Sequence, residues 1–295
     1  MTALRATLRR AAARLADAGI ESADRDAALL LAHVLGCELG EVRRREVLGH
    51  ELSDGDMARF EALVDERARR VPLQHLTGRA PFRSLELRVG PGVFVPRPET
   101  EMLVDAALEA APYGGRIVDL CTGSGAIALA IKAERPDLEV YAVELSEEAA
   151  AWAALNCKQI GLTVNLSVED AREALAGLEG RFDVVVSNPP YVPHHMEPVD
   201  PEVRDHDPAL ALYGGGRDGL ELPRRILARA AVLLHPGGTV VLEHAEVQSG
   251  ALLDHAAADP AWSDARDVPD LTGRPRALVA TRTAAPPPAS PPRVR

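Results

Sequence analysis

Residues 188–191 read Asn-Pro-Pro-Tyr and follow directly on three consecutive valines and a serine. The valines predict a buried strand, because β-branched side chains suit a packed, pleated surface, and two prolines end it because neither donates to a ladder. The side-chain oxygen of Asn188 and the carbonyl of Pro189 can accept two hydrogen bonds from one NH2 group. Pro189 and Pro190 lock the backbone that carries these acceptors, and Tyr191 adds an aromatic face. The motif therefore predicts a rigid pocket for a planar amide or aryl amine.

Such a pocket suits the transfer of a group to a weakly nucleophilic nitrogen. Oxygen acceptors on both N–H bonds turn the nitrogen lone pair toward an incoming electrophile, so positioning supplies most of the rate enhancement. The proton can leave once the nitrogen is cationic, which fits a motif without Asp, Glu or His. We expect Asn188, Pro189 and Tyr191 to be catalytic, and Pro190 to join them in contacting the substrate. The plainer alternative is that the motif only ends a strand.

A second motif, IVDLCTGSGAIALA at 117–130, predicts a strand, a glycine turn and the start of a helix. Gly123 and Gly125 let the backbone approach a ligand closely, and the helix N-terminus offers free N–H groups. Glu144 ends the next predicted strand, where a carboxylate can accept the hydroxyls of a ribose. The alternative is a turn that packs a helix against the sheet and holds no ligand.

The two motifs together indicate a ribose-bearing cofactor that carries an electrophile. Ala128 stands where the dinucleotide fingerprint has its third glycine, and no P-loop sequence occurs in the chain. The electrophile that best fits a planar nitrogen and a bound ribose is the methyl sulfonium of S-adenosylmethionine. Because ligands of open α/β sheets bind beyond the carboxyl ends of the strands, we expect Asn188 and the glycine turn to face one crevice.

The composition is that of an ordinary globular protein, with 46% hydrophobic and 26% charged residues in a chain of 295. No apolar run approaches the ~20 residues of a membrane span. The net charge of −11 disfavours direct contact with nucleic acid, because phosphate contacts usually need a basic face. Three distant cysteines match neither a zinc site nor a disulfide framework, so we expect no metal and a cytoplasmic location.

Hydrophobic periodicity divides the chain into four parts. Residues 1–75 predict a small helical bundle, and 76–97 predict a β-hairpin linker in which LELRV and VFV pair across a GPG turn. Residues 98–282 alternate strands and helices, as in a doubly wound α/β sheet, and 283–295 are proline-rich and predict disorder. Residues 192–217 interrupt the alternation with a long loop, typical of a lid or a substrate-binding segment. Strands are expected at RIVDL, EVYAVEL, VNLSV, FDVVVSN, TVVLEH and RALVATR.

Longer stretches are similar to a known family. The motifs SNPPYVP and VDLCTGSGAIALA resemble those of amino-methyltransferases with an Asp/Asn-Pro-Pro-aromatic signature, which adenine-modifying enzymes share. Residues 72–104 closely resemble the stretch that joins the helical and catalytic domains of the HemK-type release factor glutamine methyltransferases (the PrmC/HemK family, class I S-adenosylmethionine-dependent methyltransferases). Three later stretches match the same family: DPALALYGGGRDGL, LHPGGTVVLEHAEVQ and DLTGRPRALVATR. The resemblance covers nearly all of residues 1–282.

The resemblance implies methylation of the side-chain amide nitrogen, N5, of the glutamine in the Gly-Gly-Gln motif of peptide chain release factors. It also implies a seven-stranded, mostly parallel Rossmann-like sheet with an antiparallel last strand, and a helical N-terminal domain that recognises the substrate. The turn from Cys121 to Gly125 would hold the methionine end of S-adenosylmethionine, Glu144 its ribose, and Asp170 would lie beside the adenine. The complete set of cofactor-binding residues that it implies is Asp119, Cys121, Thr122, Gly123, Ser124, Gly125, Glu144, Asp170, Ala171 and Asn188.

Three of these residues depart from the family pattern. Cys121 stands where glycine is usual, so the turn needs a conformation that a side chain tolerates. Glu144 replaces the commoner Asp, and Ala171 replaces an aromatic side chain found in some relatives. Two alternatives stay open, namely a nucleic-acid adenine N6-methyltransferase, which would need a basic surface, and a cofactor-binding scaffold without catalysis. The favoured interpretation is a monomeric enzyme that acts on release factors and contacts neither membrane nor nucleic acid.

Overall fold

The computed structural model describes residues 3–270 and 272–284, so the proline-rich tail predicted at 283–295 lies outside the described residues from position 285 onward. The chain forms two compact units. The first comprises residues 1–79 together with 199–206, and the second comprises the remainder of the chain. Each unit has a hydrophobic core of its own, as independently folding domains do.

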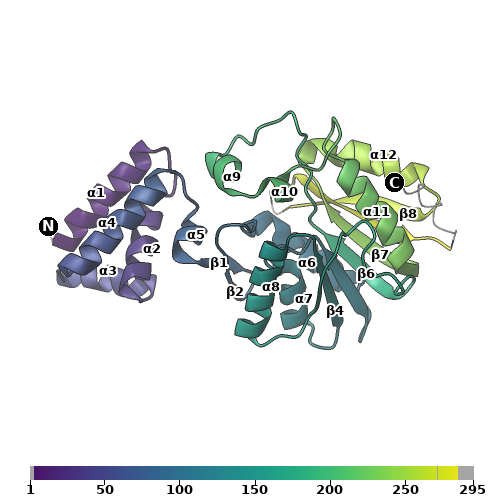
Figure 1. Ribbon diagram of the computed structural model, residues 1–295, viewed down its shortest axis with the longest axis horizontal. Helices are drawn as coiled ribbons and strands as arrows, with labels where there is room; N and C mark the ends of the chain where they lie inside the picture. The colour runs from purple at the N-terminus through teal and green to yellow at the C-terminus, as the bar shows by residue number, and fades with distance from the viewer. Residues whose placement is uncertain (1–2, 271, 285–295) are drawn as a thin grey trace. The chain divides into compact units, whose positions relative to one another are not determined.

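The first unit is a bundle of helices around an aliphatic core (Figure 1). Leu4, Leu15, Leu30 and Phe60 are buried in that core because they recur on one face of their helices. The helix α4 begins at Ser53, whose side-chain oxygen accepts a hydrogen bond from a backbone N–H of the first turn at 3.1 Å. The helices within the first 79 residues are α1 (Ala3–Asp17), α2 (Ala23–Leu35), α3 (Leu39–Leu48), α4 (Asp54–Ala68) and α5 (Leu73–Thr77).

A short helix from much later in the chain completes this unit. The helix α9 (Pro201–His206) lies within 192–217, which the sequence predicts as a long loop. Arg67 of α4 donates to the carboxylates of Asp26 and Glu202, at 2.8 Å in each case. Loss of both carboxylates would leave the guanidinium buried with an unmatched charge, which is costly. The prediction of a plain loop at 192–217 is therefore wrong for the part that docks on this cluster.

The β-hairpin lies one strand earlier than the sequence predicts. In the structure β1 (Arg79–Phe82) pairs with β2 (Leu85–Arg88), and Arg83, with a φ of +53°, turns the chain between them. The segment VFV forms no strand, although the chain does turn at GPG, where the N–H of Val93 donates to the Gly90 carbonyl at 3.4 Å. A Cβ on Gly90 would come within 2.6 Å of the Trp152 ring. The predicted hairpin across GPG is wrong, because β2 pairs with β1 instead.

The second unit is built on a seven-stranded sheet in the order β5-β4-β3-β6-β7-β9-β8. The five strands from β5 to β7 in that order pair in parallel, whereas β9 is antiparallel to both β7 and β8. The predicted doubly wound sheet with an antiparallel last strand is therefore confirmed. The strands are β3 (Arg116–Leu120), β4 (Glu139–Glu144), β5 (Asn165–Val168), β6 (Phe182–Ser187), β7 (Leu234–Glu243), β8 (Trp262–Pro269) and β9 (Pro275–Arg282).

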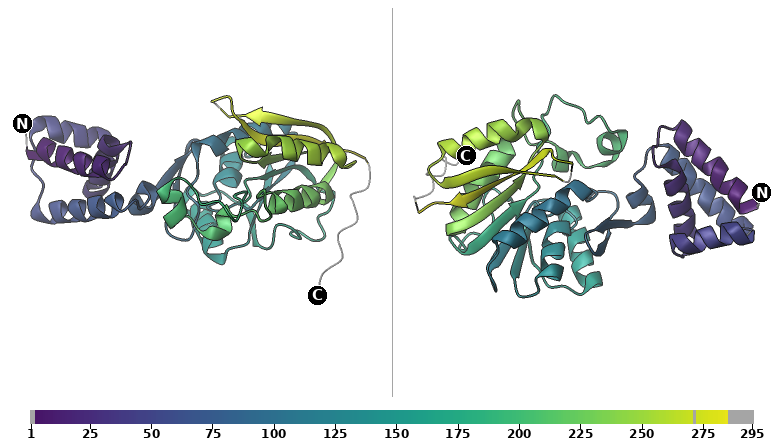
Figure 2. Two further views of the ribbon diagram at one scale, coloured as in Figure 1. Left: turned by 90° about the horizontal axis from the view of Figure 1, so that it is seen from above. Right: turned by 180° about the vertical axis from the view of Figure 1, so that it is seen from behind.

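Helices cover both faces of this sheet (Figure 2). Successive side chains of a strand point to opposite faces, so Ile117 packs in a core with α6, α7 and α8, while Val118 packs in a core with α11 and α12. These two cores fix the strand ends that carry the motifs. The helices of the second unit are η1 (Pro98–Thr100), α6 (Glu101–Ala110), α7 (Ala126–Glu134), α8 (Glu147–Ile160), α10 (Ala209–Leu212), α11 (Glu221–Leu233), η2 (Glu246–Gln248) and α12 (Ser249–Ala258).

The described part of the chain carries no helix with the length and apolar character that a membrane span needs. Within the same residues, His, Cys, Asp and Glu side chains form no group of three or more that could hold a metal ion. Cys37, Cys121 and Cys157 are all free thiols.

Candidate active site

Strand register brings the predicted site residues together at the carboxyl ends of the parallel strands, which form the carboxyl-terminal edge of the sheet. Leu120, the last residue of β3, is paired with Val143 of β4 and with Ser187 of β6. The next residues along each strand, Glu144 and Asn188, therefore flank the turn that follows β3. The strand order also reverses at this point, because β4 and β5 lie on one side of β3 and β6 lies on the other. Such a switch point is where open α/β sheets bind ligands.

The glycine turn after β3 is held by its own backbone. The N–H of Thr122 donates to the Val143 carbonyl at 2.9 Å, and the N–H of Gly125 donates to the Thr122 carbonyl at 2.9 Å. Gly123 has a φ of +57°, which favours glycine, and a Cβ added there would meet no atom within 4 Å. The turn thus presents an open face at which a ligand can lie against the backbone.

Glu144 is held by three backbone donors, one of which belongs to this turn. Its Oε2 accepts from the N–H of Gly123 at 2.8 Å, and its Oε1 accepts from the N–H groups of Leu145 at 2.8 Å and Ser146 at 2.9 Å. A carboxylate has about four lone-pair sites, so these bonds leave room for one more donor. The arrangement holds the Glu144 carboxylate beside the open face of the turn.

Asp119 stabilises the turn from inside the protein. Its side chain is fully buried, and Oδ2 accepts hydrogen bonds from the Thr122 hydroxyl and from the N–H of Ala128 at 3.3 Å. Burial raises the pKa of the Asp119 carboxyl to about 7. Thr122 and Ser124 are buried as well. Of the residues predicted to bind the cofactor, these three side chains therefore lie inside the protein rather than on the open face.

Cys121 has a left-handed backbone conformation, which favours glycine. Its φ is +64°, so the expectation that the turn adopts a conformation suited to a side chain is wrong. A residue with a Cβ in this region costs roughly 1–2 kcal/mol. Burial, with the nearby charges of Glu144 and Asp119, raises the pKa of the Cys121 thiol. The thiol is therefore not a nucleophile at neutral pH.

Asn156 links the turn to the hairpin, a role that was not predicted from the sequence. Its Nδ2 donates to the carbonyls of Ser124 at 2.9 Å and Arg88 at 3.0 Å, and its Oδ1 accepts from the N–H of Arg88 at 2.6 Å. The side chain is completely buried, so each of these bonds replaces one that water would otherwise make. An asparagine within the apolar face of a predicted helix is the only sequence signal for this role.

Asp170 and Ala171 follow the carboxyl end of β5, the outermost strand on that side of the sheet. The N–H of Glu169 donates to the Glu144 carbonyl at 2.9 Å, which brings the end of β5 up to β4. The Arg172 guanidinium holds the pKa of the Asp170 carboxyl below its usual range. Ala171 is buried and packs into the core of the second unit. Its small side chain offers little surface for stacking, as the sequence predicts.

Asn188 and Tyr191 each have a side-chain partner from a distant part of the chain. Asn188 Nδ2 donates to Oγ1 of Thr100 at 3.2 Å, and the Tyr191 hydroxyl donates to Oε1 of Glu243 at 3.2 Å. Glu243 ends β7, one strand beyond β6 in the sheet. Burial raises the pKa of the Tyr191 hydroxyl, so the phenol stays protonated. Neither Thr100 nor Glu243 was found from the sequence.

The backbone of the Asn-Pro-Pro-Tyr motif is enclosed by glycines and by Gln248. A Cβ on Gly214 would come within 2.5 Å of the Pro190 carbonyl oxygen, and one on Gly219 within 2.1 Å of the Tyr191 carbonyl oxygen. Gln248 Nε2 donates to that same Tyr191 oxygen at 2.8 Å. The GGGRDG stretch, for which no role was predicted from the sequence, therefore lets the chain pack closely around the motif.

The residues at this edge fit the predicted cofactor, S-adenosylmethionine. A ribose hydroxyl has an acceptor in the fixed Glu144 carboxylate, which keeps one lone-pair site. A bulkier residue at Gly123 would fill the open face of the turn that a ligand needs. The buried Asp119, Thr122 and Ser124 form the support for this surface.

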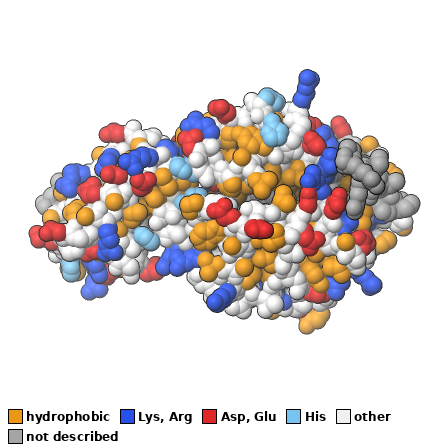
Figure 3. Space-filling view, in the orientation of Figure 1, with side chains coloured by type: hydrophobic (Ala, Val, Ile, Leu, Met, Phe, Trp, Pro, Cys, Tyr) orange, Lys and Arg blue, Asp and Glu red, His pale blue; other side chains and the backbone are white. Residues whose placement is uncertain are grey.

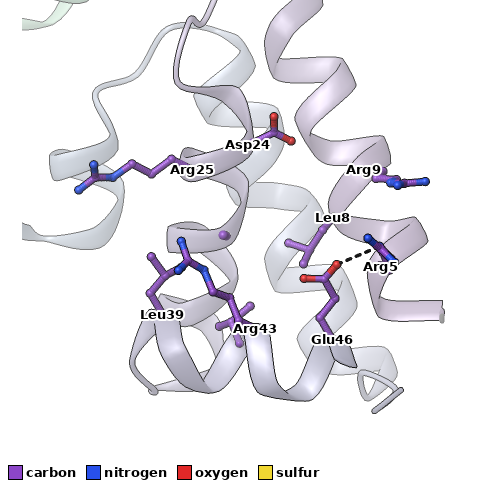
Figure 4. Close-up of a pocket in the computed structure, with 10 residues that line it drawn as sticks. Arg5, Leu8, Arg9, Asp24, Arg25, Leu39, Arg43 and Glu46 are labelled. Carbon is purple, nitrogen blue, oxygen red and sulfur yellow. Dashed lines mark ion pairs between the residues drawn. The ribbon is translucent and has the colours of Figure 1, made fainter. Parts of the chain in front are cut away.

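A separate hollow of about 650 Å³ lies in the helical unit (Figure 4). Arg5 pairs with Glu46 there at 3.3 Å. The hollow contains none of the predicted site residues, and charges of both signs line it: Arg5, Arg9, Arg25 and Arg43 with Asp24 and Glu46. On the face shown in Figure 3, basic and acidic side chains are likewise interspersed.

Comparison with known proteins matches both units of the chain. Residues 6–78 match the PrmC N-terminal domain, and residues 85–202 match the methyltransferase small domain. A methyltransferase structure from Pyrococcus furiosus superposes with a TM-score of 0.52 at 22% identity, covering 68% of this chain and 90% of that one, which supports the fold.

Two curated relatives are similar over almost their whole length. The release factor glutamine methyltransferase of Streptomyces coelicolor is 49% identical over 96% of this chain and 99% of its own length. The protein of the same name from Bifidobacterium longum is 47% identical over 92% of this chain and 97% of its own length. The resemblance seen in the sequence is therefore confirmed, and the chain is an S-adenosylmethionine-dependent methyltransferase. It belongs to the release factor glutamine methyltransferase family.

Proposed function

We propose that this chain transfers a methyl group from S-adenosylmethionine to N5 of the glutamine in the Gly-Gly-Gln motif of peptide chain release factors. The observation that carries the proposal is the position of Asn188, which leaves β6 beside the glycine turn at the switch point of the sheet. Family membership supports the same substrate, since the relatives are named for it.

Two oxygens of the motif hold the substrate amide in this proposal. The Asn188 side-chain oxygen and the Pro189 carbonyl accept the two N–H bonds of the glutamine NH2 group, and the Tyr191 ring lies against its plane. Pro190 fixes the backbone, so the acceptors are in place before the substrate arrives. Both N–H bonds are then directed at the protein, which turns the nitrogen lone pair away from it. The acidified proton leaves to solvent after transfer, so no strong base is needed.

We also propose which residues hold the cofactor. S-adenosylmethionine, when bound, supplies an electrophilic methyl group. The backbone from Cys121 to Gly125 contacts its methionine end, Glu144 accepts from its ribose, and Asp170 with Ala171 lies beside its adenine. The buried Asp119 keeps the turn in shape and does not touch the ligand, in keeping with its bonds to Thr122 and Ala128.

The remaining assignments concern partners and location. We propose that the helical part, residues 1–75, recognises the release factor, that 76–97 is a linker and that 98–282 carries catalysis. The protein acts as a cytoplasmic monomer without direct contact to nucleic acid. The net charge of −11 and the interspersed charges in Figure 3 favour a protein substrate over a polyanion.

A competition among acceptors tests the proposal. Purified release factor, duplex and single-stranded DNA, and RNA are each incubated with the enzyme and S-adenosylmethionine labelled in its methyl group. We expect incorporation into release factor alone, and none into a release factor whose Gly-Gly-Gln glutamine is replaced by alanine. Incorporation into adenine of DNA or RNA, with release factor left unlabelled, would establish the adenine methyltransferase instead.

A further inference from the structure

Tyr191 of the Asn-Pro-Pro-Tyr motif is held at both ends by residues at the end of β7 and in the short helix η2 that follows. Its hydroxyl donates to Oε1 of Glu243 at 3.2 Å, and its carbonyl oxygen accepts from Nε2 of Gln248 at 2.8 Å. The two partners are buried, with 3% and 5% of their surfaces exposed, so water competes little for these bonds. Because one bond lies at each end of the tyrosine, the two together fix the direction of its side chain.

Gln248 uses its whole amide to join three segments of the chain. Besides the bond to Tyr191, its Nε2 donates to the carbonyl of Asp218 at 2.7 Å, and its Oε1 accepts from the N–H of Ala245 at 3.0 Å. Asp218 belongs to the GGGRDG stretch, and Ala245 precedes η2. A side chain without an amide NH2 group would leave two carbonyl oxygens without this donor. The position of the Tyr191 backbone therefore depends on this one glutamine.

Glu243 is a costly partner for a tyrosine hydroxyl. Burial raises the pKa of its carboxyl to about 7, and within the described part of the chain its Oε2 makes no hydrogen bond. An apolar side chain of similar size would pack at the end of β7 without this cost. The carboxyl is therefore better explained by the bond that it makes to Tyr191 than by a contribution to stability.

We propose that Glu243 and Gln248 are positioning residues, which fix the plane of the Tyr191 ring against the substrate amide. The inference deepens the proposed function and rests on it for its substrate. Tyr191 is partly exposed, so its side chain remains accessible. A ring that could turn about its side-chain bonds would meet the planar amide in several orientations, and loss of the productive one slows transfer. Neither positioning residue touches the substrate.

The first test removes each bond while keeping the length of the side chain. We expect Glu243→Met and Gln248→Met each to lower kcat for methyl transfer to release factor about tenfold or more. Affinity for S-adenosylmethionine should stay within about twofold, because the glycine turn is held by other groups. Glu243→Gln keeps an oxygen that can accept from the hydroxyl, so it should recover most of the rate.

Arg282→Met is the matched control for a loss of buried side-chain bonds. Arg282 is 5% exposed, as Gln248 is, and donates to the backbone carbonyls of Ala231 and Thr283 at 2.7 Å in each case. It lies at the far end of β9 from the residue that pairs with Glu243. The variant should lose stability in urea unfolding and keep the kcat of the wild type.

A double-mutant cycle tests whether Glu243 acts through the tyrosine hydroxyl. Tyr191→Phe removes only that hydroxyl, so it should fold even if a methionine variant does not, and it should lower kcat as much as Glu243→Met. In the Tyr191→Phe background, Glu243→Met or Glu243→Gln should change kcat by less than about twofold, because the bond is already absent. Losses that multiply in the double variant would overturn the role of Glu243.

A further readout does not depend on turnover. The chain has four tyrosines, so NMR spectra of protein labelled with 13C in the tyrosine rings are simple, and the Tyr191 signals are identified by their loss in Tyr191→Phe. These signals should shift in Glu243→Met and Gln248→Met and stay in place in Arg282→Met. Unmoved signals, or the kcat of the wild type in both methionine variants, overturn the positioning role. If the wild type methylates no release factor although the signals behave as expected, the proposed function fails while the hold on the ring stands.

Discussion

The glycine turn and the Asn-Pro-Pro-Tyr motif lie side by side at one edge of the sheet but are held in different ways. The turn is fixed mostly through its own backbone: the N–H of Gly123 donates to Glu144, the N–H of Thr122 to the Val143 carbonyl, and the Ser124 carbonyl accepts from Asn156. The motif is fixed by side chains far along the chain, since Thr100 is 88 residues from Asn188 and Glu243 is 52 residues from Tyr191. One half of the site is therefore held mainly by bonds to its backbone, and the other half by bonds to its side chains, from partners 52 and 88 residues away.

This difference determines what a substitution does. A side chain on the motif can be removed without moving the backbone, because glycines and Gln248 hold that backbone separately. A change at the turn alters the shape of the turn itself, since Glu144 and Asp119 bond to its backbone and hydroxyl groups. We therefore expect losses of rate at the motif and losses of cofactor affinity or stability at the turn.

Asn188→Ala should have the largest effect. It removes one of two acceptors for the substrate amide, and loss of one such positioned group costs about a thousandfold in rate, or ~4 kcal/mol. Cofactor affinity should change little, because the turn is held without Asn188. Initial rates of methyl transfer and calorimetric titration with S-adenosylmethionine measure the two effects. Asn165→Ala, on β5, is the matched control, and equal losses in both variants would refute a specific role for Asn188.

Asp119→Asn should remove a pH dependence of stability. The folded-state pKa of about 7 lies above the unfolded value near 4, so the folded protein holds a proton that the unfolded chain releases. This contribution is fully present below pH ~4 and is lost as the pH rises toward 7, by about 3 kcal/mol between pH 4.5 and 6.5. Urea unfolding across that range measures it. A variant that keeps the wild-type slope would show that another group is responsible.

Glu144→Ala should weaken binding of S-adenosylmethionine about 30-fold, or ~2 kcal/mol, because the ribose loses its acceptor and three N–H groups lose theirs. The turnover rate at saturating cofactor should fall much less. Calorimetry gives the affinity and saturation kinetics the rate. If Glu144→Ala keeps its affinity for S-adenosylmethionine but loses turnover, the assignment of cofactor binding to the turn and of rate to the motif is incorrect.

Cys121→Gly should have the smallest effect and should stabilise the protein. Relief of the left-handed conformation at φ +64° contributes roughly 1–2 kcal/mol, and the greater freedom of glycine in the unfolded chain offsets part of it. We expect a gain of about 0.5–1 kcal/mol in the free energy of unfolding, measured in urea. A loss of stability would mean that packing of the thiol outweighs the backbone strain.

The sheet could be predicted where strands are buried on both faces. Val184, Val185 and Val186 belong to such a strand, and β-branched residues in a row identify it without knowledge of the fold. The strand β8 was missed, because it is an edge strand with Asp264, Arg266 and Asp267 in its sequence. The charged residues of an edge strand give it a sequence like that of a loop, so β8 can be recognised only from its pairing with β9.

The candidate site could be predicted as far as local sequence determines it. Glu144 and Asn188 were found because each ends a predicted strand, which places it at the ligand-binding edge. Thr100, Asn156 and Glu243 were not found, since their roles depend on partners that only the packed sheet and helices bring near. A buried polar residue within an apolar segment, as at Asn156 and Glu243, is the one signal that could have indicated them.

The most direct test of the account is the mass of the Gly-Gly-Gln peptide from a release factor incubated with the enzyme and S-adenosylmethionine. We predict a gain of one methyl group, located by fragmentation on the glutamine side-chain nitrogen, with the wild type and none above background with Asn188→Ala. An unmodified glutamine with the wild type, or full methylation by Asn188→Ala, would contradict it.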